Sequence, residues 1–146
     1  MPTFSRNATV DWKGNLMEGA GELKAGTGAF TLPVSFPRRI GDPQGGTSPE
    51  ELIAAALGTC YAMVVAGALA KAGASTRATR VTCTVIADKS DAGIKITTSN
   101  LEVVTEGLTG MDPATFEKTA KDALARCPVS NALRGSLAIE VQARAS

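Results

Sequence analysis

An uncharged run of residues, Leu52–Ala70, constrains the fold more than any other part of the sequence. Start and stop signals for one helix flank the run. Ser48 is a good N-cap, Pro49 suits the first helical position, and Glu51 stands where a capping box places its acidic residue. Gly73 can close the helix in a left-handed C-cap. We therefore predict one long helix that is apolar on every side, and such a helix should be buried.

A transmembrane span is the rival interpretation, because the uncharged run is just long enough to cross a bilayer. Alanine dominates the run, however, and neither an aromatic belt nor a basic flank follows it. Small residues recur at four-residue spacing and would let another backbone approach closely: Ala54, Gly58, Ala62 and Ala66. This ridge favours a helix enclosed by protein, and we expect no membrane span.

The length and composition indicate one soluble domain over residues 1–146. A chain of 146 residues with 44% hydrophobic residues can bury a sizeable core. Its formal charge of +1 argues against a nucleic-acid partner, which usually leaves a basic stripe. No signal peptide is recognised at the start, and three cysteines do not make a secreted disulfide framework. These features predict a cytoplasmic protein.

The remaining pattern predicts an α+β fold with antiparallel sheet. Short strands are expected before the long helix, followed by a loop over residues 35–47 that is rich in Pro and Gly. After the helix we expect a hairpin of strands 79–87 and 94–105, a second helix from Asp112 to about Arg126, a helical turn after Pro128 and a closing strand. A chain of this size can hardly cover a helix that is apolar all round, which indicates an intertwined homodimer.

Cysteines are the residues most suited to chemistry, because the chain contains no histidine. This absence removes Cys–His pairs and the usual zinc sites, so an activated thiol must draw on Arg, Lys or a helix N-terminus. Cys60 lies mid-helix, where a free cysteine is ordinarily a small hydrophobe. Cys83 alternates with valines on a strand and is interpreted as structural. Cys127 stands at a helix boundary, where backbone N–H groups favour a thiolate.

Three charged residues near the helix start can be explained by ordinary structural roles as well as by functional ones. Arg38 and Arg39 are ordinarily solvated loop charges, and Glu50 is ordinarily a charge that complements the helix dipole. Because Glu51 already has a capping role, Glu50 is the one that lacks a local explanation.

Two cysteine motifs resemble those of the OsmC/Ohr family of osmotically inducible and organic hydroperoxide resistance proteins. The first is GTSPEELI at residues 46–53 followed by Thr59-Cys60-Tyr61, and the second is RCPVS at residues 126–130. FPRRI at residues 36–40 and DAG at residues 91–93 extend the similarity over nearly the whole chain. The arginine just before the helix resembles the OsmC branch more closely.

The resemblance implies a thiol-dependent peroxidase with neither haem nor metal. It implies that Cys60 is the peroxidatic cysteine and Cys127 the resolving one. It further implies that Arg39 stabilises the thiolate and that Glu50 holds this arginine, with Arg38 as the alternative if the loop alignment slips by one residue. Its fold would be an intertwined homodimer with antiparallel sheets wrapped around long central helices. No cofactor would be bound, and an external dithiol, such as a dihydrolipoyl group on a lipoylated protein, would be the reductant.

Apolar neighbours of Cys60, such as Leu57, Met63 and Val64, would favour organic hydroperoxides over hydrogen peroxide. Glu50 and Cys60 are ten residues apart on one helix, a rise of roughly 15 Å, so the carboxylate cannot act on that thiolate directly. Either a long arginine, Arg39, bridges part of the gap within one subunit, or the helices of two subunits run antiparallel, so that Arg39 and Glu50 of one chain approach Cys60 of the other. We expect the second arrangement, with each site built from both subunits. Two other functions stay open: a non-catalytic protein that binds a lipid-like molecule in an apolar cavity at the dimer interface, and a general thiol–disulfide oxidoreductase. The absence of a Cys-x-x-Cys pair argues against the latter.

Overall fold

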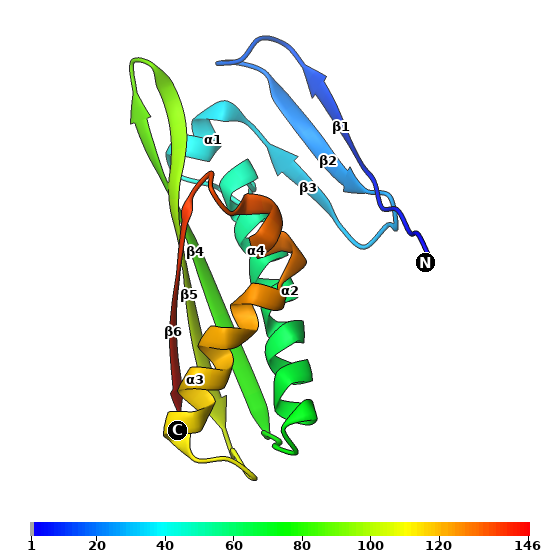
Figure 1. Ribbon diagram of the computed structural model, residues 1–146. Coiled ribbons are helices and arrows are strands. Elements are labelled where there is room, and N and C mark those ends of the chain that lie inside the picture. The colour runs from blue at the N-terminus through cyan, green and yellow to red at the C-terminus, as the bar shows by residue number, and fades with distance from the viewer. Residues whose placement is uncertain (1) are drawn as a thin grey trace. The chain divides into compact units, whose positions relative to one another are not determined.

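The computed structural model describes residues 2–146 and confirms the α+β class, with two three-stranded sheets and several helices (Figure 1). The chain divides into two compact units, residues 1–52 and residues 53–146. The long helix α2, Pro49–Lys71, begins in the first unit and continues into the second. The expectation of a single domain over residues 1–146 stays a prediction, and each unit is described by itself below.

The first unit holds a small antiparallel sheet and a short helix. The sheet has the order β1-β2-β3, so that each strand pairs with the next one along the chain. Leu23 and Ala25 of the middle strand are its buried apolar residues, together with the polar Thr47. The elements are β1 (Ala8–Lys13), β2 (Ala20–Ala25), β3 (Thr31–Val34) and α1 (Phe36–Ile40).

Helix α1 lies inside the stretch that the sequence predicts to be a loop, so that part of the prediction is wrong. Ser35 caps the helix, because its hydroxyl accepts a hydrogen bond from the Arg38 N–H at 3.4 Å. Pro37 stands in the first turn, where its missing N–H costs nothing. A proline in a loop-like sequence looks like a breaker, but the position of Pro37 suits a helix start. The result is that Arg38 and Arg39 are carried by a helical turn.

The second unit contains the larger sheet, in the order β4-β5-β6. Strands β4 (Ala78–Ser90) and β5 (Gly93–Glu106) form the predicted antiparallel hairpin. Strand β6 (Ala138–Ala145) pairs parallel to β5, a pairing that the prediction of antiparallel sheet does not include. A parallel neighbour needs a long crossover connection. Here the crossover is α3 (Pro113–Ala123), the 3₁₀ turn η1 (Leu124–Arg126) and α4 (Pro128–Leu133).

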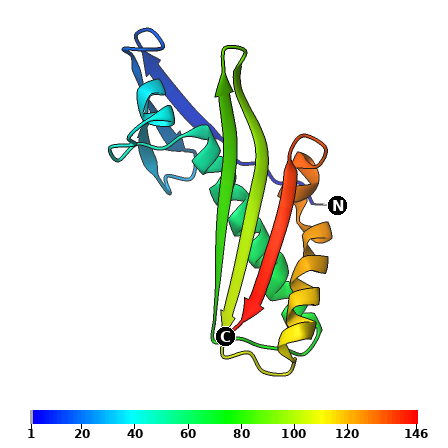
Figure 2. The ribbon, with the colours of Figure 1, turned by 90° about the vertical axis from the view of Figure 1, so that its left-hand side faces the viewer.

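Helices α2 and α3 cover the same face of this sheet, and the core lies between the helices and the strands (Figure 2). Helix α2 contributes one buried residue per turn, while β5 contributes Leu101 and Val103. Phe116, Ala120 and Ala123 of α3 close the core from the other helix. The buried residues of α2 are Leu57, Tyr61, Val65 and Leu69.

Helix α2 is not enclosed by its own chain, in line with the expectation that a chain of this size can hardly cover it. Its opposite face is exposed, and the Met63 side chain on that face is 69% exposed. Small residues make up the rest of the exposed face: Ala55, Ala56, Thr59, Ala66, Gly67 and Ala70. The helix is long and apolar enough to cross a membrane, but a core helix of a soluble protein meets the same criterion. The structure is compatible with a soluble protein.

Gly58 explains part of the predicted small-residue ridge within one chain. A Cβ atom at this position would lie 3.4 Å from the Cβ of Cys83 and 4.0 Å from Cγ1 of Val81. The glycine therefore faces β4, where an added methyl group would make ordinary van der Waals contacts with the strand. Ala66, further along the ridge, is exposed.

Candidate functional site

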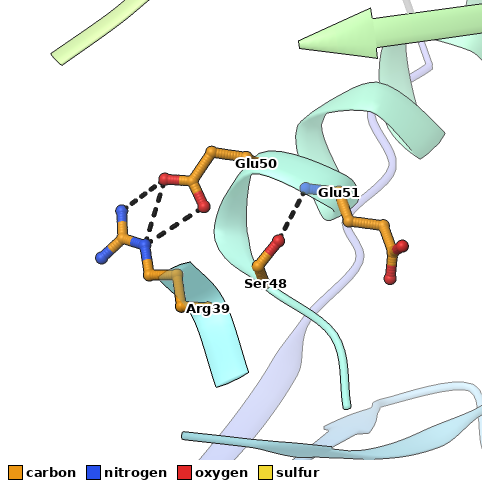
Figure 3. Close-up of polar contacts among 4 residues, drawn as sticks. All are labelled: Arg39, Ser48, Glu50 and Glu51. Carbon is orange, nitrogen blue, oxygen red and sulfur yellow. Dashed lines mark hydrogen bonds and ion pairs between the residues drawn. The ribbon is translucent and has the colours of Figure 1, made fainter. Parts of the chain in front are cut away.

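An ion pair between Arg39 of α1 and Glu50 of α2 lies at the start of the long helix (Figure 3). Arg39 Nη2 donates to Glu50 Oε1 at 2.6 Å, and Nε lies 3.1 Å from each carboxylate oxygen. The side chains are only 28% and 15% exposed. A guanidinium held by both oxygens of one carboxylate has a fixed orientation, which is the geometry that a planar fork gives best.

The ion pair shifts the pKa values of both side chains so that each charged form is favoured. Hydrogen bonding from Arg39 lowers the pKa of the Glu50 carboxyl, although partial burial opposes the change. The hydrogen bond to Glu50 likewise raises the pKa of Arg39. Glu50, which lacks a local explanation in the sequence, therefore has Arg39 as its partner, and the role that the resemblance implies for this pair stays a prediction.

Glu51 has the capping position that the sequence predicts, but only half of the capping box forms. The Glu51 N–H donates to the Ser48 hydroxyl at 3.1 Å (Figure 3). Its carboxylate accepts from the Thr47 hydroxyl at 2.7 Å instead of returning to the Ser48 backbone. Thr47 is buried, so this bond satisfies its hydroxyl and fixes the entry of the chain into α2.

Cys127 is buried completely and is the N-cap of α4, where its sulfur accepts from the Ser130 N–H at 3.5 Å. The sequence predicts that backbone N–H groups favour its thiolate, but their effect on the pKa is smaller than that of burial. Burial raises the pKa of the Cys127 thiol, and the Ser130 and Val129 N–H groups offset this only in part. Hydrogen bonding and charge from Cys60 raise the pKa of Cys127 further.

Cys60 therefore lies beside Cys127, and both thiols are free in this structure. Cys60 is half-buried, on the boundary between the buried and exposed faces of α2. Met63 is exposed, whereas Leu57 is buried in the core and Val64 packs against it. Of the predicted apolar neighbours, only Met63 has a largely open side chain.

Tyr61 connects α2 to α3 next to the two thiols, a contact that the sequence did not reveal. Its hydroxyl donates to the Ala120 carbonyl at 2.5 Å, and its side chain is fully buried. Burial, with a smaller contribution from the charge of Cys127, raises the pKa of Tyr61 to about 12. The tyrosine therefore stays neutral and holds the helix that leads to Cys127.

The third cysteine has the structural surroundings that the sequence predicts for it. The sulfur of Cys83 lies 3.2 Å from the hydroxyl of Ser99 on the neighbouring strand β5. Both residues contribute to the inner face of the sheet, and Ser99 is fully buried. No role in the chemistry is needed to explain Cys83.

Ser130 is a further residue that sequence reasoning did not single out. It is 1% exposed, and its hydroxyl has no hydrogen-bond partner among residues 2–146, although its N–H contacts Cys127. Its position three residues after Cys127 was the available signal, because this spacing places it at the third position of the capped helix.

The structure thus brings the predicted residues together as two pairs. Arg39 and Glu50 belong to residues 1–52, whereas Cys60 and Cys127 belong to residues 53–146. Arg38 is half-buried and packs against Gly46: a Cβ atom added to this glycine would lie 3.1 Å from the Cδ of Arg38. Within residues 2–146 no group of three His, Cys, Asp or Glu side chains is placed to hold a metal ion.

The family model for OsmC-like proteins matches residues 41–142, which include Glu50 and both thiols of the second pair. The chain belongs to the OsmC-like family. It is 32% identical to the peroxiredoxin OsmC of Escherichia coli over 141 residues, which cover 96% of this chain and 97% of that protein. The name of this relative supports a peroxidase-type redox function in the OsmC-like family.

Solved structures of OsmC-like proteins share the fold. An organic hydroperoxide resistance protein OsmC from Legionella pneumophila aligns with a TM-score of 0.77 at 23% identity, covering 99% of each chain. The organic hydroperoxide resistance protein OhrB of Bacillus subtilis aligns with a TM-score of 0.73 at 22% identity, covering 94% of this chain and 98% of that one. At these identities the likeness concerns the fold alone.

Proposed function

We propose that this protein reduces organic hydroperoxides to alcohols with Cys60 as the peroxidatic cysteine and Cys127 as the resolving one. The Cys60 thiolate attacks the distal peroxide oxygen, the O–O bond breaks, and the alkoxide leaves as the alcohol after it gains a proton. Cys60 is left as a sulfenic acid. The Cys127 thiolate then attacks the Cys60 sulfur, which forms a disulfide and releases water. An external dithiol reduces the disulfide and is itself oxidised.

The neighbourhood of the two thiols supports this proposal most strongly. A half-buried thiol can meet a peroxide, while a fully buried one beside it is protected from direct oxidation. Two thiols that already lie side by side need little movement to form a disulfide. The peroxidase-type function of the family agrees with this division of roles.

Arg39 is proposed to stabilise the Cys60 thiolate and the leaving oxygen, with Glu50 as the residue that orients its guanidinium. Arg38 is the alternative. Glu50 and Cys60 are ten residues apart in α2, a rise of about 15 Å, so a direct influence along one helix is excluded. The proposal therefore includes a homodimer in which one chain contributes Arg39 and Glu50 to the Cys60 of the other.

The exposed face of α2 supports both the dimer and the choice of substrate. It is apolar over its length and carries Met63, which is 69% exposed. A surface of this kind is usually covered by a partner. Beside Cys60 it would also accept the hydrocarbon part of an organic hydroperoxide better than hydrogen peroxide. The reductant is proposed to be a dithiol such as a dihydrolipoyl group, and the protein is proposed to act in the cytoplasm.

The deciding experiment measures peroxide consumption with a supplied dithiol, comparing cumene-type, fatty-acid-type and hydrogen peroxides. We expect Cys60→Ser to abolish turnover. Cys127→Ser should complete one reaction per site and then stall as Cys60 overoxidises. Cys83→Ser is the matched control, because its thiol contacts only structural neighbours, and it should keep most of the activity.

Three outcomes would contradict the proposal. No peroxide consumption by folded wild-type protein would favour a binding protein with an apolar cavity. Reduction of protein disulfides without peroxide consumption would favour a thiol–disulfide oxidoreductase. An inactive but folded Cys83→Ser protein together with a fully active Cys127→Ser protein would reassign the resolving thiol.

A further inference from the structure

The contacts of Cys127 in the structure stabilise its thiolate only in part. Resolution, as proposed above, needs the Cys127 thiolate, because the thiolate and not the thiol is the nucleophile. The sulfur is fully buried, and burial disfavours the charged form. The hydrogen bond that its sulfur accepts from the Ser130 N–H is long, at 3.5 Å. A further donor is needed at the moment when the charge forms.

Among the groups near Cys127, one hydroxyl is free to donate a hydrogen bond. The titratable groups that act on it are the Cys60 thiol and the Tyr61 hydroxyl, both from α2. Cys60 is the sulfur under attack, and Tyr61 already donates its proton to the Ala120 carbonyl at 2.5 Å. Arg126 precedes Cys127 but is exposed. The Ser130 hydroxyl is buried and has no partner.

The position of Ser130 in α4 suits such a role. Side chains of a helix tilt toward its N-terminus, and the Ser130 N–H already touches the sulfur at that end. The usual use of a polar side chain at this position is to return to the backbone N–H of the N-cap residue. That N–H is occupied, since the Cys127 N–H donates to the Leu124 carbonyl at 3.1 Å.

We propose that Ser130 is a positioning residue for resolution: its hydroxyl donates a hydrogen bond to the Cys127 thiolate and so assists the attack on Cys60. A thiolate accepts hydrogen bonds more strongly than a thiol does, so the bond forms as the proton leaves. The Cys127 thiolate then attacks the sulfur of the Cys60 sulfenic acid. The S–S bond forms, the S–O bond breaks, and the departing hydroxide takes up a proton to become water. This inference rests on the proposed function for its role, but the hydrogen bond itself does not.

The first test measures the bond without any peroxide. In a Cys60→Ser, Cys83→Ser background Cys127 is the only thiol, and its titration is followed by the ultraviolet absorbance of the thiolate. Ser130→Ala should move the midpoint upward by about one pH unit, the size of one hydrogen bond to a charged group. Ser130→Thr should keep the wild-type midpoint. Ser130→Gly serves as a second variant without a hydroxyl if Ser130→Ala does not fold.

The second test follows the two steps separately by rapid mixing with an organic hydroperoxide. Formation of the Cys60 sulfenic acid should keep its rate in Ser130→Ala, while formation of the disulfide should slow about tenfold at neutral pH. Thr105→Val is the matched control, because Thr105 carries another buried hydroxyl without a partner, on β5. It should leave both steps and their pH profiles unchanged.

The outcomes separate the two proposals. Wild-type protein that forms no Cys60–Cys127 disulfide would refute the proposed function, while the titration would still decide on the hydrogen bond. A normal wild-type cycle with equal titration midpoints in Ser130→Ala and wild type would overturn the role of Ser130. An equal slowing in Thr105→Val would also overturn it, since the effect would then belong to any buried hydroxyl.

Discussion

Glu50 holds Arg39 through both carboxylate oxygens, with the closest contact of 2.6 Å between Oε1 and Nη2. The contact joins the short helix α1 to the first turn of α2, and both side chains are largely covered. An ion pair with two-point geometry and little solvent differs from the exposed pairs elsewhere on the protein. The fixed orientation of the guanidinium suits the anion-stabilising role proposed for Arg39.

The first prediction concerns the pH dependence of stability. The pKa of Glu50 is lowered by the hydrogen bond from Arg39, so the folded protein holds this carboxylate charged to lower pH than the unfolded chain does. The stabilisation is present above the unfolded pKa and is lost as the pH falls through the folded pKa. Urea unfolding of wild type and Glu50→Gln between neutral pH and pH ~3 should show their difference shrinking in acid.

Glu106→Gln is the matched control for this measurement. Glu106 pairs with Arg77 at 2.8 Å, but these side chains are 56% and 74% exposed. Exposed pairs contribute little, so this variant should follow wild type closely at every pH. A Glu50→Gln curve that ran parallel to wild type down to the most acidic point would show that the pair does not contribute as described.

The second prediction concerns the hydroxyl of Tyr61. The Leu124 N–H donates to the Lys121 and Asp122 carbonyls, and the Ala120 carbonyl accepts the Tyr61 hydroxyl. Tyr61→Phe keeps the ring in the core but removes this buried donor. Unfolding by urea should show a loss of about 1–3 kcal/mol, the cost of leaving a buried acceptor unsatisfied. An unchanged free energy of unfolding would show that water replaces the hydroxyl.

Much of the fold follows from the sequence because its signals are local. The caps around Pro49 and the uncharged run predict α2, and alternation predicts the β4–β5 hairpin. Helix α1 was missed because Pro37 looks like a breaker unless the Ser35 cap is recognised before it. The parallel pairing of β6 was missed because register between distant strands depends on the path of α3 and α4, which local patterns do not reveal.

The residues of the candidate site were predictable from the sequence, but their surroundings were not. The motif resemblance proposes Cys60, Cys127, Arg39 and Glu50 as site residues. In the structure Arg39 pairs with Glu50, and Cys60 lies near Cys127. The surroundings were not predictable, since burial of Cys127 and the uncommitted hydroxyl of Ser130 depend on packing between helices far apart in sequence. Gly58 illustrates the same limit: its spacing predicts that another backbone approaches the helix, but not that this neighbour is strand β4 of the same chain.

The third prediction separates the two arginines. If Arg39 stabilises the Cys60 thiolate, Arg39→Ala should slow alkylation of Cys60 at neutral pH and slow peroxide reduction about tenfold or more. Arg38→Ala is the matched control, because the two residues are adjacent in α1 but only Arg39 pairs with Glu50. Rates are measured in a Cys83→Ser, Cys127→Ser background, where Cys60 is the sole thiol. A reversed order of effects would transfer the role to Arg38.

The last prediction concerns which chain supplies each residue. Glu50 and Cys60 are ten residues apart on the continuous helix α2. The exposed apolar face of this helix is expected to be covered by a second subunit. We therefore expect active sites that combine Arg39 and Glu50 of one subunit with Cys60 of the other. Cys60→Ser and Glu50→Ala proteins should each be inactive, or nearly so, as homodimers.

Unfolding these two variants together and refolding the mixture should restore peroxide reduction in the heterodimers. In a heterodimer one site receives Glu50 from the Cys60→Ser chain and Cys60 from the Glu50→Ala chain, so all its residues are wild type. The other site carries both substitutions and stays inactive. Different affinity tags on the two chains allow the heterodimers to be purified and counted. Purified heterodimers without activity would place Arg39, Glu50 and Cys60 of each site in a single chain.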